Sequence, residues 1–211
     1  ACDSLGFASS IEELEALVSG LEPPVVVSVE GPWCSGKTSF LEQLWTRLAG
    51  TPRQGRAFVH GCAGVYLGWC SPWKFDAPRD ARTNLLTTFI GATEGGTKEL
   101  RRRVRKPLEA VLCTLGVAAE ATAPVGGAAL ARILTSCDAP VAETLRAQLE
   151  STITSPEDGA SVWVFVDDLD RCRDDVALGV LETIRQYLGL PRTVLVLAAD
   201  WEQLRGIICR A

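Results

Sequence analysis

The sequence lacks several features that mark particular classes of protein. It has no methionine and a single histidine, His60. Its eight cysteines form no C-x-x-C pair and show no ligand-like spacing with His60, which argues against a zinc site. A chain of 211 residues also does not need a disulfide framework to fold. We therefore expect reduced thiols and a cytoplasmic protein, with the inner face of a membrane as the alternative.

The chain has no overall excess of positive charge and no long apolar run. The net charge of −5 gives no general reason to expect nucleic-acid binding. The basic run 98–106, KELRRRVRK, predicts a solvated helix face, with a nucleic-acid or anionic-membrane contact as the alternative. No uninterrupted apolar run reaches the ~20 residues of a membrane span. The nearest, 111–134, is broken by a glutamate, a proline and a Gly-Gly pair, and predicts a helical pair or the remnant of a membrane insert.

Composition and periodicity predict one globular α/β domain over residues 1–211. Hydrophobic residues make up 47% of the chain and charged residues 22%. Apolar runs at 25–30, 65–73, 161–166 and 193–200 predict strands, the first of them buried on both faces. Segments with helical spacing predict helices at 9–20, 38–50, 81–93, 176–189 and 201–210. This alternation predicts a parallel sheet between two layers of helices, with a helical insert at about 94–154.

A glycine-bounded loop lies between the first strand and the next helix. It matches G-x-x-x-x-G-K-[ST], and its residues are Gly31, Pro32, Trp33, Cys34, Ser35, Gly36, Lys37 and Thr38, followed by Ser39. Glycines let backbone N–H groups approach phosphate oxygens, and a helix N-terminus favours the same anion. Lys37 could bridge the β and γ phosphates, and the Thr38 hydroxyl could bind Mg²⁺. The pattern predicts a nucleotide site, and a purely structural turn is the alternative.

Three aspartates follow the apolar strand that begins at Ser161. We expect this strand to lie next to the one that feeds the loop, with Asp167 as a second Mg²⁺ partner. Asp168 would then orient or polarise an attacking water. The alternative is that Asp167, Asp168 and Asp170 only begin a loop and cap the next helix. Asp200 ends the last strand and is equally compatible with a site at the sheet edge and with a helix cap.

The motifs resemble the KAP family of P-loop NTPases along most of the chain. The matching segments are DSLGFASSIEELEALV, GPWCSGKTSFLEQL, SPWKFDAPRDARTNLLTTFI, VFVDDLDRC and LVLAADWEQLRGII. The resemblance implies an additional-strand P-loop core related to the AAA+ and STAND ATPases. It also implies that Lys37 and Thr38 contact phosphate and Mg²⁺, and that Asp167 organises Mg²⁺. Asp168 would be catalytic and Arg171 a charge sensor, while the segment 3–7 would lie near the base.

The sequence departs from the family in two places. Cys34 stands where the family usually has glycine; if φ is positive there, a Cβ costs about 1–2 kcal/mol. We expect that cost to weaken nucleotide binding and Cys34→Gly to tighten it. The resemblance further implies a longer protein, truncated here at its C-terminus, because the later core and the helical lid are missing.

The function expected from these observations is ATP binding, and with it Mg²⁺-dependent ATP hydrolysis, by a regulatory or motor module of a larger protein. No Asn-Lys-x-Asp motif for reading guanine is present, which favours ATP. Three alternatives stay open. The domain could be a nucleotide-dependent switch that recruits a protein partner or self-associates without hydrolysis. It could be a small-molecule kinase, or a scaffold bound to DNA or a membrane through the basic run.

Overall fold

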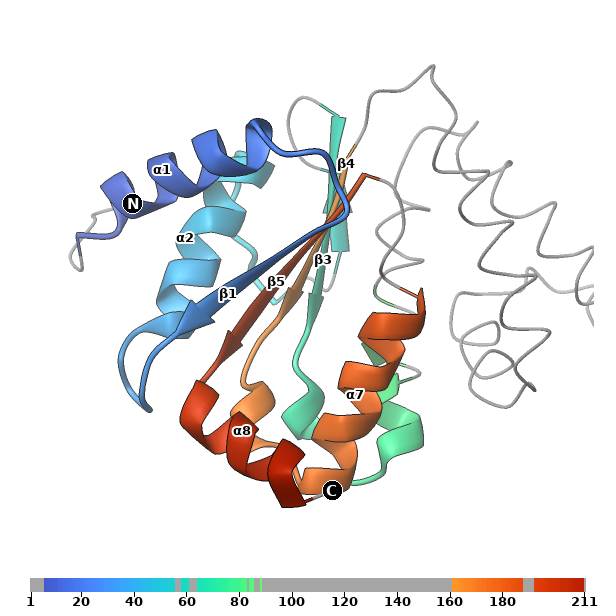
Figure 1. Cartoon of the computed structure of the whole chain (residues 1–211). Coiled ribbons are helices and arrows are strands. Elements are labelled where there is room, and N and C mark those ends of the chain that lie inside the picture. Colours follow the sequence, from blue (N-terminus) through green and yellow to red (C-terminus); the bar gives the residue numbers. More distant parts are fainter. Residues whose placement is uncertain are drawn as a thin grey trace, which may run out of the picture.

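The computed structural model describes residues 6–55, 58–60, 64–82, 84–85, 88, 161–187 and 192–210 (Figure 1). The α-helices are α1 (Ala8–Ser19), α2 (Lys37–Ala49), α7 (Asp174–Tyr187) and α8 (Trp201–Arg210), and residues 78–82 are also helical. The strands are β1 (Val25–Glu30), β2 (Phe58–His60), β3 (Val65–Cys70), β4 (Ser161–Val166) and β5 (Thr193–Ala199). Two short 3-10 helices are η2 (Pro72–Lys74) and η4 (Leu169–Arg171). The predicted insert at 94–154 and the basic run 98–106 lie outside the described residues.

The five strands among the described residues form one sheet in the order β1-β5-β4-β3-β2. The first four strands of this order are parallel, which confirms the α/β prediction. β2 pairs antiparallel with β3 at the edge and was not predicted, because three residues carry too little periodicity to distinguish a strand from a loop. The predicted strand 65–73 ends at Cys70, and η2 begins at Pro72 because proline has no N–H for a ladder hydrogen bond.

The strand that carries the aspartates is not adjacent to the strand that feeds the loop. β5 pairs with β1 on one side and with β4 on the other, so it separates the two. The expectation that β4 lies next to β1 is therefore wrong, whereas the additional-strand core implied by the family resemblance is confirmed. The carboxyl ends of β1 and β4 still lie at the same edge of the sheet, since all three strands are parallel.

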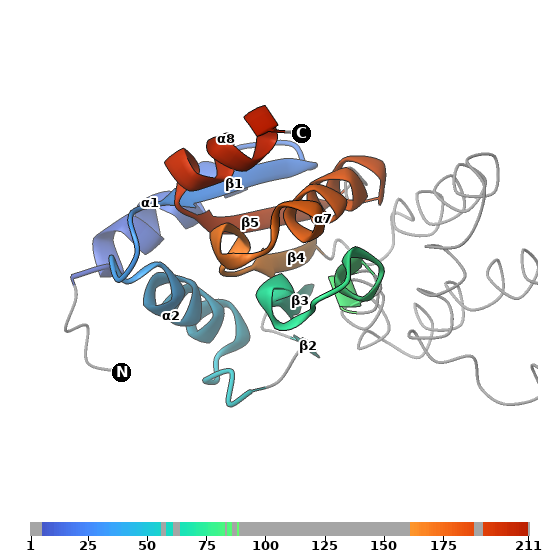
Figure 2. The ribbon, with the colours of Figure 1, turned by 90° about the horizontal axis from the view of Figure 1, so that it is seen from below.

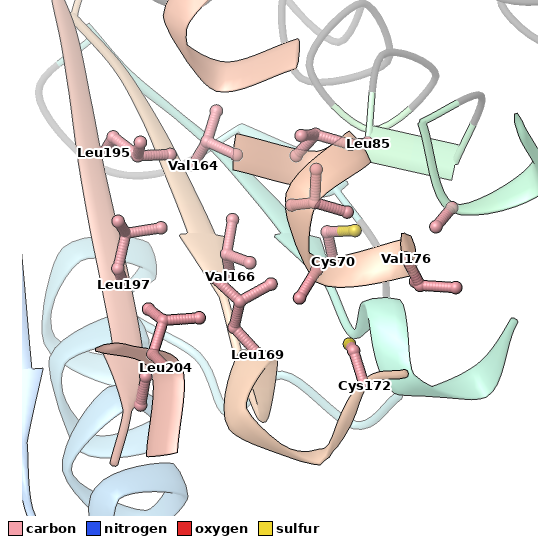
Figure 3. Close-up of a cluster of buried hydrophobic side chains, with 14 of the residues drawn as sticks. Cys70, Leu85, Val164, Val166, Leu169, Cys172, Val176, Leu195, Leu197 and Leu204 are labelled. Atoms are coloured by element: carbon pink, nitrogen blue, oxygen red, sulfur yellow. The ribbon is translucent and has the colours of Figure 1, made fainter. Parts of the chain in front are cut away.

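Helices cover both faces of the sheet, with α1 and α2 on one face and α7 and α8 on the other (Figure 2). Alternate residues of each central strand point into opposite layers. On the α2 side, Trp45 packs among Trp69 and Phe165, with ring centroids 6.0 and 5.6 Å away. On the α7 side, a second apolar cluster includes Cys70, Val164, Val166, Leu195 and Cys172 (Figure 3). The two clusters fix the positions of the strand ends that carry the loop and the aspartates.

β1 is not buried on both faces as predicted. Its residues alternate between half-buried and exposed, and Val26 is 62% exposed. One edge of β1 pairs with β5, and no described strand pairs with its other edge. A mostly apolar run does not reveal such an edge position, because pairing partners come from distant parts of the chain.

No serine side chain caps the start of α1. Phe7 occupies the N-cap position, and no side chain caps the helix there. Ser9 and Ser10 lie inside the first turn, so the helix starts slightly earlier than the pattern indicated. None of the described helices is long and apolar enough to cross a membrane.

Candidate nucleotide site

The glycine-bounded loop connects β1 to α2 at the carboxyl edge of the sheet. Gly36 is left-handed, with φ 91°, and forms the N-cap of α2. Cys34 is also left-handed, with φ 65°, and its side chain is exposed. At Gly31, a Cβ would collide with the Ser35 side chain. The positive φ at Gly36 therefore favours glycine, a Cβ at Gly31 would displace the Ser35 side chain, and the loop adopts the curled conformation that forms anion-binding concavities.

The first turn of α2 carries Lys37, Thr38 and Ser39. There is no acidic residue in this turn, so the partly positive end of the helix is not neutralised there. Lys37 is buried, and its Nζ donates hydrogen bonds to the carbonyl oxygens of Gly31 (2.8 Å) and Pro32 (3.2 Å). The Lys37 ammonium thus lies inside the curve of the loop.

Asp167 follows β4 directly and lies against α2. The Thr38 hydroxyl donates a hydrogen bond to its Oδ1 at 3.1 Å. Burial, and then the charge of Asp168, raises the pKa of Asp167 to about 6, while the hydrogen bond from Thr38 opposes the shift. A half-buried hydroxyl in contact with a buried carboxylate forms an oxygen-rich position that could hold a hard cation.

This pair does not form a self-sufficient metal cage. Among the described residues, no group of three or more His, Cys, Asp or Glu side chains could hold a metal ion. Mg²⁺ in phosphate-transfer sites is usually bound by one or two protein ligands together with the substrate phosphates and water. The pair of Thr38 and Asp167 is compatible with that kind of site and not with a structural metal site.

Asp168 has left-handed backbone geometry, with φ 58°, and its carboxylate pairs with Arg171 at 3.1 Å. The Arg171 guanidinium carbon also lies 5.6 Å from the ring centroid of Trp33 and 5.4 Å from that of Trp73. Trp33 belongs to the loop and Trp73 to η2. Arg171 therefore contacts the loop, η2 and the candidate water-orienting carboxylate at once, and we call this group the tryptophan–arginine cluster.

The structure brings most of the predicted site residues to one edge of the sheet. The loop residues 31–36, the first turn of α2 and the segment after β4 all lie there. Asp200 does not join them through its side chain: its Oδ1 accepts hydrogen bonds from the backbone N–H groups of Glu202 and Gln203, as a helix cap does. The side chain of His60 and the basic run 98–106 are outside the description.

Sequence reasoning gave no site role to three residues that contact or influence the site. Asp170 faces Lys37 with an Oδ2–Nζ distance of 3.7 Å. Trp73 flanks Arg171, and Arg53 contributes to lowering the pKa of Asp167. The spacing of three residues between Asp167 and Asp170 was a usable signal for a turn that returns the second carboxylate to the site. No local pattern indicates Trp73 or Arg53, since both reach the site only through tertiary packing.

Comparison with known proteins agrees with this geometry. None of the curated proteins matches the chain significantly. The family model described as the KAP family P-loop domain matches residues 7–210, which is nearly the whole chain. With β5 between β1 and β4 and a Gly-Lys-Thr loop at the start of α2, the chain belongs to the KAP family of P-loop domains.

Proposed function

We propose that this domain binds Mg-ATP at the loop 31–36 and hydrolyses it. The observation that carries the proposal is the 3.1 Å hydrogen bond between the Thr38 hydroxyl, in the first turn of α2, and Asp167, which follows β4. A phosphate loop needs this juxtaposition, because Mg²⁺ must contact a loop hydroxyl and an acidic strand end at once. The domain is taken to extend over residues 1–211, an extent that the family match over 7–210 supports.

The residues fit Mg²⁺ and a triphosphate. Thr38 and Asp167 supply the hydroxyl and carboxylate oxygens that Mg²⁺ prefers, and glycine at position 31 leaves room for the Ser35 side chain in the loop. When bound, Mg²⁺ would neutralise charge on the β and γ phosphates. The backbone N–H groups around Gly36 and the Lys37 ammonium would orient the same phosphates.

A pocket beside the loop offers a place for the base. Its volume is about 200 Å³, and it is lined by Phe7, Ser10, Val29, Glu30, Ser35, Gly36, Lys37 and Phe40. The rings of Phe7 and Phe40 meet edge to face, with centroids 5.5 Å apart. A flat aromatic base can pack against these aromatic rings, so we place adenine there.

We expect Phe7→Ala to weaken binding of ATP while leaving binding of inorganic triphosphate unchanged.

Hydrolysis would rely on Asp168, Lys37 and Arg171. Asp168 would orient water for attack on the γ phosphate, and the two cations would neutralise the charge that develops in the transition state. Asp168 is paired with Arg171 at 3.1 Å, so its carboxylate must leave or share this partner to contact water. That pairing is also the observation that favours the second candidate, a nucleotide switch in which hydrolysis is negligible.

A single-turnover assay separates these two functions. Phosphate release from Mg-ATP is measured for the wild type, Lys37→Ala, Asp168→Asn and the control Glu13→Gln, an exposed residue of α1. For an ATPase, Lys37→Ala loses binding, Asp168→Asn binds but does not release phosphate, and Glu13→Gln behaves as the wild type. Binding without phosphate release in the wild type would establish the switch. Absence of any nucleotide binding would refute both functions.

A further inference from the structure

Asp170 is a second buried carboxylate, and it lies close to Lys37, the lysine of the proposed phosphate site. Its side chain is only 3% exposed, and its Oδ2 lies 3.7 Å from the Lys37 Nζ. Its Oδ1 is buried and has no hydrogen-bond partner in the part of the chain that the structure describes. A buried carboxylate with one unpaired oxygen is costly, so this residue depends strongly on the ammonium beside it.

The Lys37 ammonium has three N–H donors. Two donate to the carbonyl oxygens of Gly31 and Pro32, and Asp170 forms an ion pair with the ammonium at 3.7 Å, which is beyond hydrogen-bond distance. To contact the β and γ phosphates, the ammonium must turn at least partly away from these groups. That movement would leave Asp170 as an uncompensated buried charge close to a polyphosphate.

We propose that Asp170 is a positioning residue that makes the site discriminate between Mg-bound and metal-free nucleotide. The inference rests on the proposed nucleotide binding. Without a divalent cation, the four negative charges of ATP and the Asp170 carboxylate compete for one ammonium, and their mutual repulsion is only weakly screened because Asp170 is buried. With Mg²⁺ present, the cation neutralises phosphate charge, so the ammonium can be shared and the repulsion is reduced.

The test compares binding of ATP with excess Mg²⁺ and with EDTA by calorimetry. In the wild type, we expect metal-free ATP to bind much more weakly than Mg-ATP. Asp170→Asn keeps an oxygen that can accept from Lys37 but removes the charge. We expect it to tighten metal-free binding about tenfold or more and to change Mg-ATP binding by less than about threefold.

Matched controls make this result specific. Asp175→Asn removes an exposed charge five residues further along, and we expect it to leave the ratio of the two affinities unchanged because water screens its charge. Asp170→Ser is a second neutral variant in case the asparagine prevents folding. Like Asp170→Asn, it should lower the ratio of the affinity for Mg-ATP to the affinity for metal-free ATP.

The outcomes separate this inference from the proposed function. If the wild type binds neither form of ATP, the nucleotide site itself is refuted, and the inference with it. If the wild type binds Mg-ATP but the neutral variants weaken both forms in parallel, or leave their ratio unchanged, Asp170 only supports the fold and the inference is wrong.

Discussion

Cys34 adopts φ 65°, a conformation that favours glycine. The positive φ on which the sequence expectation depended is therefore present in the folded loop, and the strain of a Cβ in this conformation counts against folding. This strain weakens nucleotide binding only to the extent that binding increases it, so folding stability and affinity need separate measurements.

We expect Cys34→Gly to stabilise the fold rather than tighten binding. Removing the Cβ relieves about 1–2 kcal/mol of strain, and the greater freedom of glycine in the unfolded chain takes back about 0.5–1 kcal/mol. The free energy of unfolding in urea should rise by up to about 1.5 kcal/mol, with the affinity for Mg-ATP changed less than about twofold. A large gain in affinity without added stability would show that the free loop is not strained.

The raised pKa of Asp167 makes the stability of the free protein depend on pH. Its ordinary value is 3.8, and burial, followed by repulsion from Asp168, raises the pKa to about 6. The folded state holds the proton more tightly than the unfolded state. The free energy of unfolding therefore falls as pH rises from about 4 to about 6, and it stays at this lower value above that range.

We expect Asp167→Asn to remove the destabilisation that the buried, ionised Asp167 carboxylate causes. At about pH 7.5, the free energy of unfolding should increase by about 1–2 kcal/mol, after allowance for solvent screening, and by about half as much at about pH 5. The same variant should lose Mg-ATP affinity. Urea unfolding at both pH values measures the first effect; a variant less stable than the wild type at the higher pH would contradict the assigned cause.

At the scale of elements, the tryptophan–arginine cluster connects three segments that are far apart in the sequence. Trp33 comes from the loop, Trp73 from η2 and Arg171 from η4. Each cation–π contact at an exposed position contributes about 0.5–1 kcal/mol. The cluster therefore stabilises one position of the loop, but by an amount small enough for the contacts to break and re-form.

A double-mutant cycle tests the coupling between η2 and η4. We expect Arg171→Ala and Trp73→Ala to show an interaction energy of about 0.5–1 kcal/mol in urea unfolding. Arg173→Ala serves as the matched control, because Arg173 is exposed and pairs with Asp175, and its coupling to Trp73→Ala should be close to zero. Additive effects of Arg171→Ala and Trp73→Ala would show that the two side chains do not interact in solution.

Local patterns predicted the central elements well and their arrangement poorly. β4 and β5 are continuous apolar runs, and the loop is marked by Gly31, Gly36 and Lys37, so each can be recognised without knowing its neighbours. The order of the strands, the exposure of β1 and the contacts of Asp170 depend on pairing between segments far apart in the chain. Period and composition do not encode such pairing directly, which explains why β5 was not placed between β1 and β4.

At the scale of the whole molecule, ligand binding should appear as added stability. The loop and the aspartates lie on parts of one sheet with a shared core, so a ligand that bridges them resists unfolding of the entire domain. Mg-ATP at about 100 times its Kd adds about 2.7 kcal/mol, which corresponds to a rise in Tm of about 5–10 °C for a chain of this size.

Thermal unfolding with Mg-ATP, Mg-ADP and Mg-GTP measures this gain and its base specificity. The shift should saturate, should be larger with ATP than with GTP and should disappear in Lys37→Ala. An equal shift in Lys37→Ala would place the bound nucleotide somewhere other than the loop.

The position of β5 has a consequence for amide hydrogen exchange. All seven of its residues are buried, and it is hydrogen-bonded to a parallel strand on each side. Its amides should exchange slowest, whereas those of β1, whose second edge pairs with none of the strands that the structure describes, should exchange sooner. The phosphate loop thus extends from the less protected of the two strands, and nucleotide binding should slow exchange most in β1 and least in β5.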